Sequence, residues 1–373
     1  MNDHAQLAIT GVDGSQWVVH GPGSEASPVQ LEQSSVGELF DAPVQTFRKA
    51  RVGQPGSTYM GRRFLERNIT LDLTSVGATG REWARIDSLL RRAFDYDEPA
   101  TLTCTTEISG ARRLKLRLEK EPEYREDLDP HALRVGRWTF HLVADDPFWL
   151  GESYTDEFVF DGLNWYGDGV TVKNPGDVPV WPEWVLTAPA KFILPDVSFT
   201  DPTQKTRQVA LPFQPLKRDV VVNTDPLEEM IVANDDTLLW AQMGGQFFTN
   251  PIPPHTLEAQ VPVSVDPLPM IPWVVPDEWR MWIAHEIAAW AKRLGMEEVM
   301  RRTPNDVADE IKRILKASTP QWVADVTPDW LEEITRSAIA DAITAAWGSV
   351  GNMAGATAQL RLQFRWSRPW GLE

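Results

Sequence analysis

The chain contains 373 residues, and its 53 acidic side chains against 36 basic ones give a net charge of −17 at pH 7. Hydrophobic residues at 42% and charged residues at 24% are typical of a folded globular protein, not of a disordered or a membrane protein. The acidic balance argues against sequence-unspecific nucleic-acid binding, which depends on basic side chains that neutralise phosphates. We also expect no sequence-specific nucleic-acid contact, and no apolar run is long enough to predict a membrane span. The single cysteine, Cys104, excludes a disulfide framework.

Charge divides the chain into two unlike halves. Residues 1–150 carry 18 basic and 22 acidic side chains, a net charge of −4, whereas residues 151–373 carry 18 and 31, a net charge of −13. Within the first half, residues 48–92 hold ten basic and four acidic side chains, a local band of +6. Such a band on an acidic chain suits docking onto an acidic neighbouring subunit. The alternative is a solvated charged face without a partner. The length by itself predicts two or three domains.

Residues 1–150 are predicted to form an α+β domain. Three segments alternate apolar and polar residues, as half-buried antiparallel strands do. They are residues 69–73, 114–118 and 138–142. Between the first two, Thr79 and Glu82 have the spacing of a capping box at the start of a helix. The apolar stripe of this helix consists of Trp83, Ile86, Leu90 and Phe94.

A hairpin arm is expected at about residues 47–63. The segment 53–61, GQPGSTYMG, is too rich in glycine to pack as part of a core. Basic side chains flank it on both sides. They are Arg48, Lys49, Arg51, Arg62 and Arg63. We interpret these five residues as candidates for docking between subunits.

Residues 151–275 are predicted to form a mostly-β sandwich, a jelly roll. Of the 29 prolines, 17 lie between residues 175 and 276, which disfavours long helices. Short strand candidates are separated by turn residues. They are FVFDG, GVTVKN, WPEWVLTA, KFILPD, RQVALPF, RDVVVNT, TLLWAQ and FFTNPIPP. A last alternating segment at 360–366 predicts one more strand, so residues 353–373 are assigned to the same sandwich.

Residues 276–352 are predicted to form an α-helical insertion in this sandwich. Apolar residues recur at helical spacing between 279 and 294. Thr-Pro pairs at 303–304, 319–320 and 327–328 each place a capping hydroxyl before a proline at the first helical position.

No motif for catalysis, for a cofactor or for a metal is present, so we expect no enzyme activity and no cofactor. The HEIAA segment at 285–289 lacks the second histidine of a zinc-protease helix. The Asp145-Asp146 pair and the NDD segment at 234–236 stand in turn contexts, where such residues stabilise the backbone. The alternative, paired carboxylates acting as general acid and base, has less support. Cys104 lies in the strand-like segment TLTCTT and is interpreted as a packing residue.

Tryptophan is frequent, with 17 copies. In the predicted sandwich, Trp165, Tyr166 and Trp184 are candidates for stacking against a sugar ring. The alternative is packing in the core or at interfaces, where tryptophan buries a large area. Trp181 and Trp184 lie three residues apart, so on a strand they point to opposite faces, and at most one can lie on a binding surface.

The segment 138–149, WTFHLVADDPFW, closes the first domain, and NPGD at 174–177 with Trp181-Pro182 opens the second. This arrangement resembles the distal tail protein family of long, non-contractile-tailed bacteriophages, whose members in phages of actinobacteria are often called minor tail proteins. The resemblance extends over residues 7–370, apart from the predicted helical insertion.

The resemblance implies a structural role. Members of the family form a hexameric ring at the end of the tail tube, with galectin-like or carbohydrate-module-like sandwich domains projecting outward. The ring links the tail tube protein to the tape-measure protein and the tail-tip hub protein. The arm at 47–63 resembles the family's extended hairpin, which reaches the adjacent protomer. We therefore expect a virion protein of the tail tip, assembled in the host cytoplasm, whose negative charge lets DNA pass. Binding of host cell-wall glycan by the sandwich is the alternative role.

Overall fold

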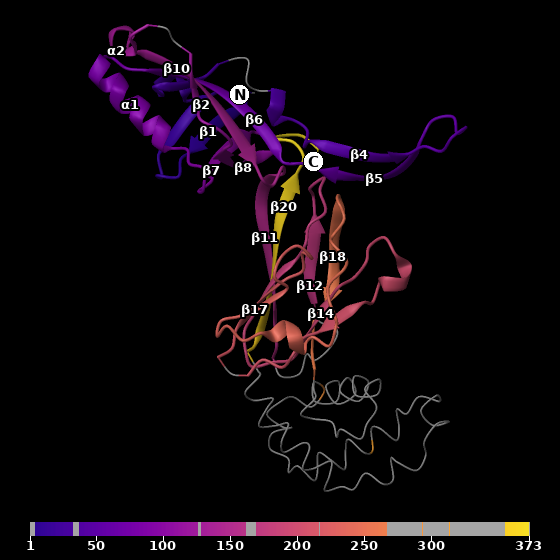
Figure 1. Cartoon of the computed structure of the whole chain (residues 1–373). Helices are drawn as coiled ribbons and strands as arrows, with labels where there is room; N and C mark the ends of the chain where they lie inside the picture. Colours follow the sequence, from indigo (N-terminus) through magenta and orange to yellow (C-terminus); the bar gives the residue numbers. More distant parts are fainter. Residues whose placement is uncertain are drawn as a thin grey trace. The chain divides into compact units, whose positions relative to one another are not determined.

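The computed structural model describes residues 4–32, 37–125, 128–161, 169–215, 217–266 and 355–372, together with Arg293 and Arg313. The chain divides into two compact units (Figure 1). Unit 1 comprises Met1–Ser153, Pro175–Pro179 and Gln363–Glu373, and unit 2 comprises Tyr154–Asn174 and Val180–Leu362. The predicted helical insertion at 276–352 lies outside the described residues, apart from the two isolated arginines.

Unit 1 contains ten complete strands, which pair antiparallel. They are β1 (Gln6–Thr10), β2 (Gln16–His20), β3 (Val29–Leu31), β4 (Val44–Lys49), β5 (Thr58–Phe64), β6 (Arg67–Val76), β7 (Ala100–Thr106), β8 (Gly110–Leu118), β9 (Glu123–Tyr124) and β10 (Val135–Ala144). One layer has the order β2-β1-β7-β8, and the other has the order β10-β6-β3. The end of β8 joins the layers, because Leu118 pairs with Leu142 of β10. Strands β4 and β5 form a separate two-stranded ribbon.

The helices of unit 1 are α1 (Gly80–Arg92) and α2 (Pro130–Leu133), with short 3-10 turns η1 (Ser24–Ala26) and η2 (Gly37–Leu39). The capping prediction for α1 is confirmed, since Thr79 Oγ1 accepts a hydrogen bond from the Glu82 amide at 3.2 Å. The Glu82 carboxylate in turn accepts from the Ala78 amide at 3.0 Å. These bonds satisfy two amide groups at a helix end that has no intrahelical acceptors for them.

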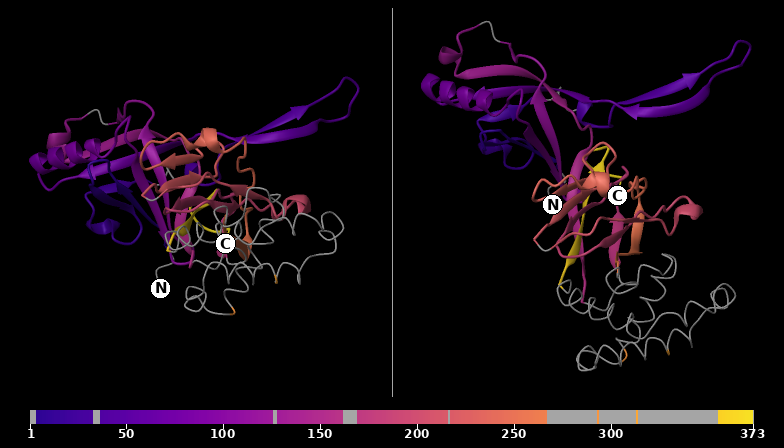
Figure 2. Two further views of the ribbon diagram at one scale, coloured as in Figure 1. Left: turned by 90° about the horizontal axis from the view of Figure 1, so that it is seen from below. Right: turned by 60° about the horizontal axis from the view of Figure 1, so that its bottom comes forward.

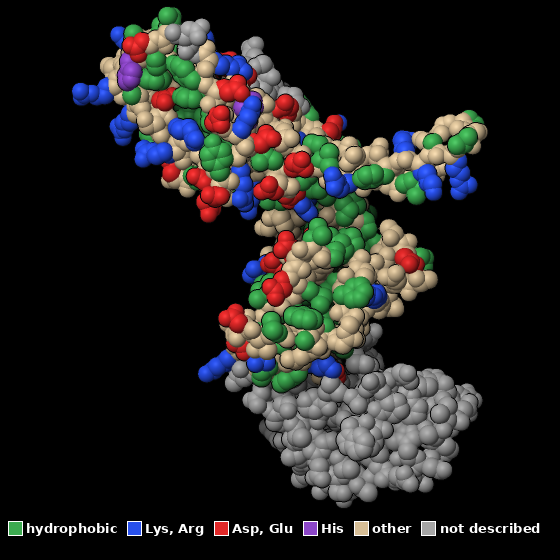
Figure 3. Space-filling model, in the orientation of Figure 1, with side chains coloured by type: hydrophobic (Ala, Val, Ile, Leu, Met, Phe, Trp, Pro, Cys, Tyr) green, Lys and Arg blue, Asp and Glu red, His purple; other side chains and the backbone are tan. Residues whose placement is uncertain are grey.

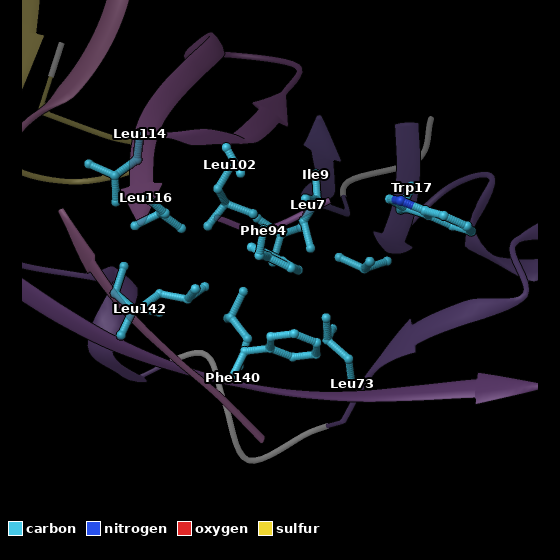
Figure 4. Packing of buried hydrophobic residues seen from close by; sticks show 14 of the residues in the cluster. Leu7, Ile9, Trp17, Leu73, Phe94, Leu102, Leu114, Leu116, Phe140 and Leu142 are labelled. Carbon is cyan, nitrogen blue, oxygen red and sulfur yellow. The ribbon is translucent and has the colours of Figure 1, made fainter. Parts of the chain in front are cut away.

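The core of unit 1 lies between its two layers. Leucine and isoleucine side chains of β1, β7 and β8 face Leu73, Phe140 and Leu142 of the opposite layer, and Phe94 lies between them (Figure 4). The alternation in the predicted strands produces this arrangement, because every second side chain of a strand points to one face. Each of these residues is at most 4% exposed. The predicted strands at 69–73, 114–118 and 138–142 are thereby confirmed as parts of β6, β8 and β10.

Unit 2 is built from short antiparallel strands. Its complete strands are β12 (Gly169–Asn174), β13 (Glu183–Leu186), β14 (Phe192–Pro195), β15 (Gln208–Ala210), β16 (Val220–Asn223), β17 (Ile231–Ala233), β18 (Thr256–Pro262) and β19 (Ser264–Val265). Strands β11 (Trp149–Val159) and β20 (Thr357–Trp366) contribute residues to both units. The sheets of unit 2 have the orders β17-β16-β13-β20, β12-β18 and β15-β14-β19.

The mostly-β, antiparallel character expected for unit 2 is confirmed. Trp184 of β13 lines a small cavity together with Val172 of β12 and Val261 of β18, so two of these sheets pack face to face. The finer expectation of a galectin-like or carbohydrate-module-like jelly roll stays a prediction.

Two predicted strands of unit 2 are wrong. The segment 237–242 forms the 3-10 helix η4 (Leu239–Gln242), which follows a turn in which the Asp235 carboxylate accepts from the Thr237 amide at 3.2 Å. The segment 247–254 is a loop with a single bridge at Ile252. The buried Asp196 carboxylate accepts from the Thr249 and Asn250 amides. These two backbone amides therefore donate to a side chain and not to the carbonyl groups of a neighbouring strand.

The end of the described chain also departs from expectation. The sequence pattern assigns residues 353–373 as a whole to the sandwich domain, but Gln363–Glu373 belong to unit 1. Strand β20 pairs with β13 only through residues 358–361. From Gln363 onward the segment belongs to unit 1, where Gln363 bonds the Gly151 carbonyl and Ser367 bonds Asp177.

Candidate interaction surfaces

The predicted arm is a two-stranded ribbon formed by β4 and β5, and the views in Figure 2 show it extending from the rest of unit 1. The pairing runs from Val44 opposite Phe64 to Lys49 opposite Thr58, and its register shifts at Met60 of β5, which has no partner on β4. At the tip, Gly53 and Gly56 have φ values of 81° and 79°, a region that side chains other than glycine rarely adopt. The glycines that ruled out a core segment therefore form the turn of the hairpin.

The five candidate docking residues all lie on this ribbon and are all exposed. Directly paired residues of an antiparallel ribbon share a face. Thr46 pairs with Arg62 and Gln45 pairs with Arg63, and the alternation along β4 adds Arg48 to the first face and Lys49 to the second. Each face of the ribbon therefore carries two cations.

Within the described residues, none of the five cations takes part in an ion pair. The guanidinium of Arg62 lies over the ring of Phe64, at 5.1 Å from its centroid. Large apolar side chains are exposed on the same ribbon, and Figure 3 shows them beside the cations. They are Val44, Phe47, Val52, Tyr59 and Met60, each at least 46% exposed. An unpaired ribbon with free cations and exposed aromatic side chains has the composition of a protein interface.

Not every basic residue of the band at 48–92 belongs to this surface. Arg67 is fully buried and bonds to backbone carbonyl groups. Its pKa is lowered to about 10, chiefly by burial, so the side chain is charged at neutral pH. The sequence count of the band therefore overstates the charge that is available to a partner.

One of the three candidate residues for sugar stacking, Trp184, is not accessible to a ligand. Trp184 is 1% exposed, so its ring packs in the core of unit 2 and cannot stack on a sugar. Trp181 is half-buried and lies before β13, so the expected alternation of the two rings along one strand does not apply to it. Trp165 and Tyr166 lie outside the described residues.

The cavity beside Trp184 offers no substitute for this platform. Its volume is about 20 Å³, which is room for one water molecule and not for a sugar ring. Apart from the indole of Trp184, its lining includes two polar side chains, Asp196 and Asn250. These two residues bond each other: the Asn250 amide donates to the Asp196 carboxylate, and the Asn250 side chain donates to the Asp196 carbonyl.

The acidic segments have structural partners. Asp145 forms an ion pair with Arg117, and Asp146 accepts from the Phe148 amide in a turn. Cys104 is fully buried, and burial raises the pKa of its thiol to about 11, which disfavours the reactive thiolate. Among the described residues, no group of histidine, cysteine and carboxylate side chains has the arrangement of a metal site. The HEIAA segment at 285–289 lies outside them.

In the part of the chain that the structure describes, no helix has the length and apolar character needed to cross a membrane.

Known proteins related to the chain are phage tail proteins. No protein-family model matches the chain. Minor tail protein Gp27 of Mycobacterium phage L5 is 28% identical over 286 residues, which covers 62% of this chain and 84% of Gp27. Minor tail protein Gp27 of Mycobacterium phage D29 is 26% identical over 306 residues, which covers 66% of this chain and 89% of that protein.

Comparison with solved structures gives matches at TM-scores below 0.5. The Dit (gp 19.1) protein of phage SPP1, described as a paradigm of the hub adsorption apparatus in phages infecting Gram-positive hosts, is 14% identical with a TM-score of 0.47. The comparison covers 69% of this chain and 94% of that protein. A chain of the phage P2 baseplate in its activated conformation with Ca is 13% identical with a TM-score of 0.39, covering 70% and 97% of the two chains.

The matched regions cover 84% and 89% of the two relatives, and both relatives are named minor tail protein Gp27. The resemblance to phage tail proteins seen in the sequence is therefore confirmed: the chain is a homologue of the mycobacteriophage minor tail protein Gp27.

Proposed function

We propose that the chain is a structural component of a phage tail tip, and that copies of unit 1 join through the arm into a ring. The arm carries this proposal. Its two strands pair with each other and with no other strand of the described chain. A ribbon in this state leaves both faces free for a partner.

The side chains of the arm suit a protein partner. Interfaces are enriched in aromatic residues, methionine and arginine, and the arm exposes Phe47, Tyr59 and Met60 between its cations. Tyr59 and Met60 are 54% and 62% exposed. Burying such side chains removes apolar area from water, and the cations orient the partner.

The partner that we propose is a second copy of the chain. The chain is acidic overall, with a net charge of −17, so a neighbouring copy offers carboxylates to the arm. An arm that contacts a different surface of its neighbour makes a head-to-tail contact, and repetition of that contact by rotation closes a ring. The number six comes from the resemblance to distal tail proteins.

In this proposal the ring joins the tail tube protein to the tape-measure and tail-tip hub proteins, and the protein resides in the virion tail. The homology to minor tail proteins supports a role in the tail. A negatively charged lumen would let DNA pass without holding its phosphates. A role without catalytic turnover is part of this proposal, and the homology to minor tail proteins supports it.

Saccharide binding by unit 2 has no specific support in the described residues. Of its three candidates, Trp184 is buried, and Trp165 and Tyr166 lie outside those residues. We therefore do not propose it as a second function.

Light scattering and electron microscopy of the purified full chain test the ring. We expect a closed ring for the wild type, and a folded protein without rings when residues 47–62 are replaced by a short turn. The chain has no second segment of equal charge whose deletion could serve as a control. Circular dichroism of the shortened protein therefore checks that unit 1 still folds. Rings that form without the arm would refute its proposed role.

A further inference from the structure

The arm leaves unit 1 at a root made of residues 40–43 and 64–67. Phe64 packs at this root in a small cluster with Ala42, Phe148 and Val178. The Leu65 amide donates to the Pro43 carbonyl at 3.0 Å and closes the ribbon. Since β4 and β5 pair only with each other in the described chain, contacts at the root determine the direction of the arm.

Arg67 connects the root to three parts of unit 1. Its Nη1 donates to the Leu39 carbonyl at 2.9 Å and also bonds the Phe40 carbonyl. Its Nε and Nη2 donate to the Pro147 carbonyl at 2.9 and 2.7 Å. Nη2 also donates to the Ser367 carbonyl at 2.9 Å. A buried guanidinium is costly unless its donors are satisfied, and here all three nitrogens have acceptors on the backbone.

The Ser367 carbonyl belongs to a segment that contacts the root at two further points. The guanidinium of Arg368 binds the Asp41 carboxylate with two bonds, Nε to Oδ1 at 2.5 Å and Nη2 to Oδ2 at 2.8 Å. The ring of Trp370 meets the ring of Phe40 edge-on, with centroids 5.0 Å apart. Thus a segment some three hundred positions later in the sequence holds the root before β4 and after β5.

The same segment is fixed on its other side by a second buried arginine. Arg112 is 1% exposed, and it donates to the carbonyls of Arg368 and Gly371 at 2.9 Å each. Its guanidinium lies 3.8 Å from the centroid of the Trp366 ring. Asp177 accepts from the Ser367 amide at 2.8 Å. The segment therefore has a fixed position from which it can hold the arm.

We propose that residues 366–371 act as a clasp that sets the direction of the arm, with Arg67 and Arg368 as its positioning residues. The clasp stabilises one orientation of the ribbon before a partner arrives. Less conformational entropy is then lost on assembly, as in other preorganised interfaces. The value of this device for ring formation rests on the function proposed above, but the clasp itself is a property of the single chain.

The test measures the arm in the unassembled full chain. Spin labels at Ser57→Cys, near the arm tip, and Ser88→Cys, on α1, report the direction of the arm within unit 1. Both serines are exposed, and the native Cys104 is fully buried and stays unlabelled in the folded chain. Arg368→Asp removes the bond to Asp41 and adds repulsion.

The control is Arg361→Asp, which breaks an ion pair with Glu183 in unit 2. Arg361 and Arg368 are alike in exposure, with side chains 48% and 43% exposed.

We expect a single narrow distance distribution in the wild type and in the control, and a broad one in Arg368→Asp. Exchange of the Leu65 amide should become roughly fivefold faster in that variant, as expected for the loss of about one net hydrogen bond. Adding Asp41→Arg to Arg368→Asp should narrow the distribution again, which a general loss of stability would not allow. Arg67→Lys, whose ammonium cannot reach all the carbonyls at once, should also broaden the distance distribution, and Asp41→Arg should not restore it.

An unchanged distribution in both Arg368→Asp and Arg67→Lys would refute the clasp. Failure of the proposed function looks different: the distribution would respond as expected, but wild-type chains with an ordered arm would form no ring.

Discussion

Charge reversal on one face of the arm provides a sharp prediction for the assembly contact. Arg48 and Arg62 share one face of the ribbon, and Lys49 and Arg63 share the other. Replacing both residues of a face by glutamate changes the charge of the arm by −4 and leaves the other face intact. All four side chains are exposed and outside the ion pairs of the described chain, so the fold of unit 1 should not change.

The magnitude follows from the exposure of these groups. An exposed ion pair contributes about 0.2–1 kcal/mol, and reversal replaces that attraction by a repulsion of similar size. Two reversals should therefore weaken the contact between neighbouring copies by roughly 1–4 kcal/mol, which corresponds to about five- to several-hundredfold in Kd. Because the ribbon has cations on both faces, we expect each pair of reversals to weaken association.

Light scattering or sedimentation over a range of protein concentrations measures the effect. The matched control is Arg81→Glu with Arg85→Glu, an equal charge change on the exposed side of α1. The difference between arm variants and control should shrink in 1 M salt, where charges are screened over about 3 Å instead of about 10 Å at 0.1 M. If both arm variants assemble as tightly as the wild type at low salt, the cations do not lie in the contact. If only one does, a single face of the ribbon meets the neighbour.

Two further predictions concern the core of unit 2 and the clasp. Trp184→Ala should lower the free energy of unfolding by about 3–5 kcal/mol, because it leaves a cavity in the core. It should not change any glycan binding that depends on Trp165, because the Trp184 ring is buried. Thermal or denaturant unfolding and a glycan pull-down measure the two effects, and an intact stability with lost glycan binding would contradict the burial argument. The bond to Arg368 lowers the pKa of Asp41 below its ordinary value of 3.8, so the clasp contact is present above that value and is lost as the pH falls through the lower folded pKa. Distance distributions of the arm recorded from neutral to strongly acidic pH should broaden only at the acidic end in the wild type, and a transition near neutrality would contradict this assignment.

The burial of the tryptophans changes what their frequency means. Five of them, Trp17, Trp83, Trp149, Trp184 and Trp366, are at most 8% exposed. Several indole N–H groups form hydrogen bonds to other segments: Trp83 donates to Ser75, Trp138 to Asp87 and Trp149 to the Leu39 carbonyl. Of the tryptophans within the described residues, only Trp240 is exposed, at 58%. The excess that pointed to interfaces or sugars therefore serves mainly the core in this part of the chain.

Local patterns determined several elements of this protein. The alternation at 69–73 and 138–142 predicted strands because a strand buries every second side chain. Thr79 and Glu82 predicted the start of α1, because the cap satisfies backbone groups that are set by local geometry alone. The glycines and flanking cations at 48–63 predicted an exposed hairpin, since such a segment has too few apolar side chains to be held in a core. The homology to a phage minor tail protein agrees with the resemblance carried by 138–149.

Other features depend on contacts between distant residues, and only the tertiary structure decided them. The spacing of Trp181 and Trp184 predicts opposite faces of one strand, but β13 begins at Glu183, and the burial of Trp184 depends on the sheet that packs against it. The basic band at 48–92 includes Arg67, because nothing local in the sequence shows that the carbonyl of Ser367 lies 2.9 Å from its side chain. The segment after β20 alternates as if it stayed in the sandwich, yet its bonds to Asp41 and Arg112 place it in unit 1. Sequence pattern records the periodicity of burial along one element, whereas the partner that buries it is selected by packing across the whole fold.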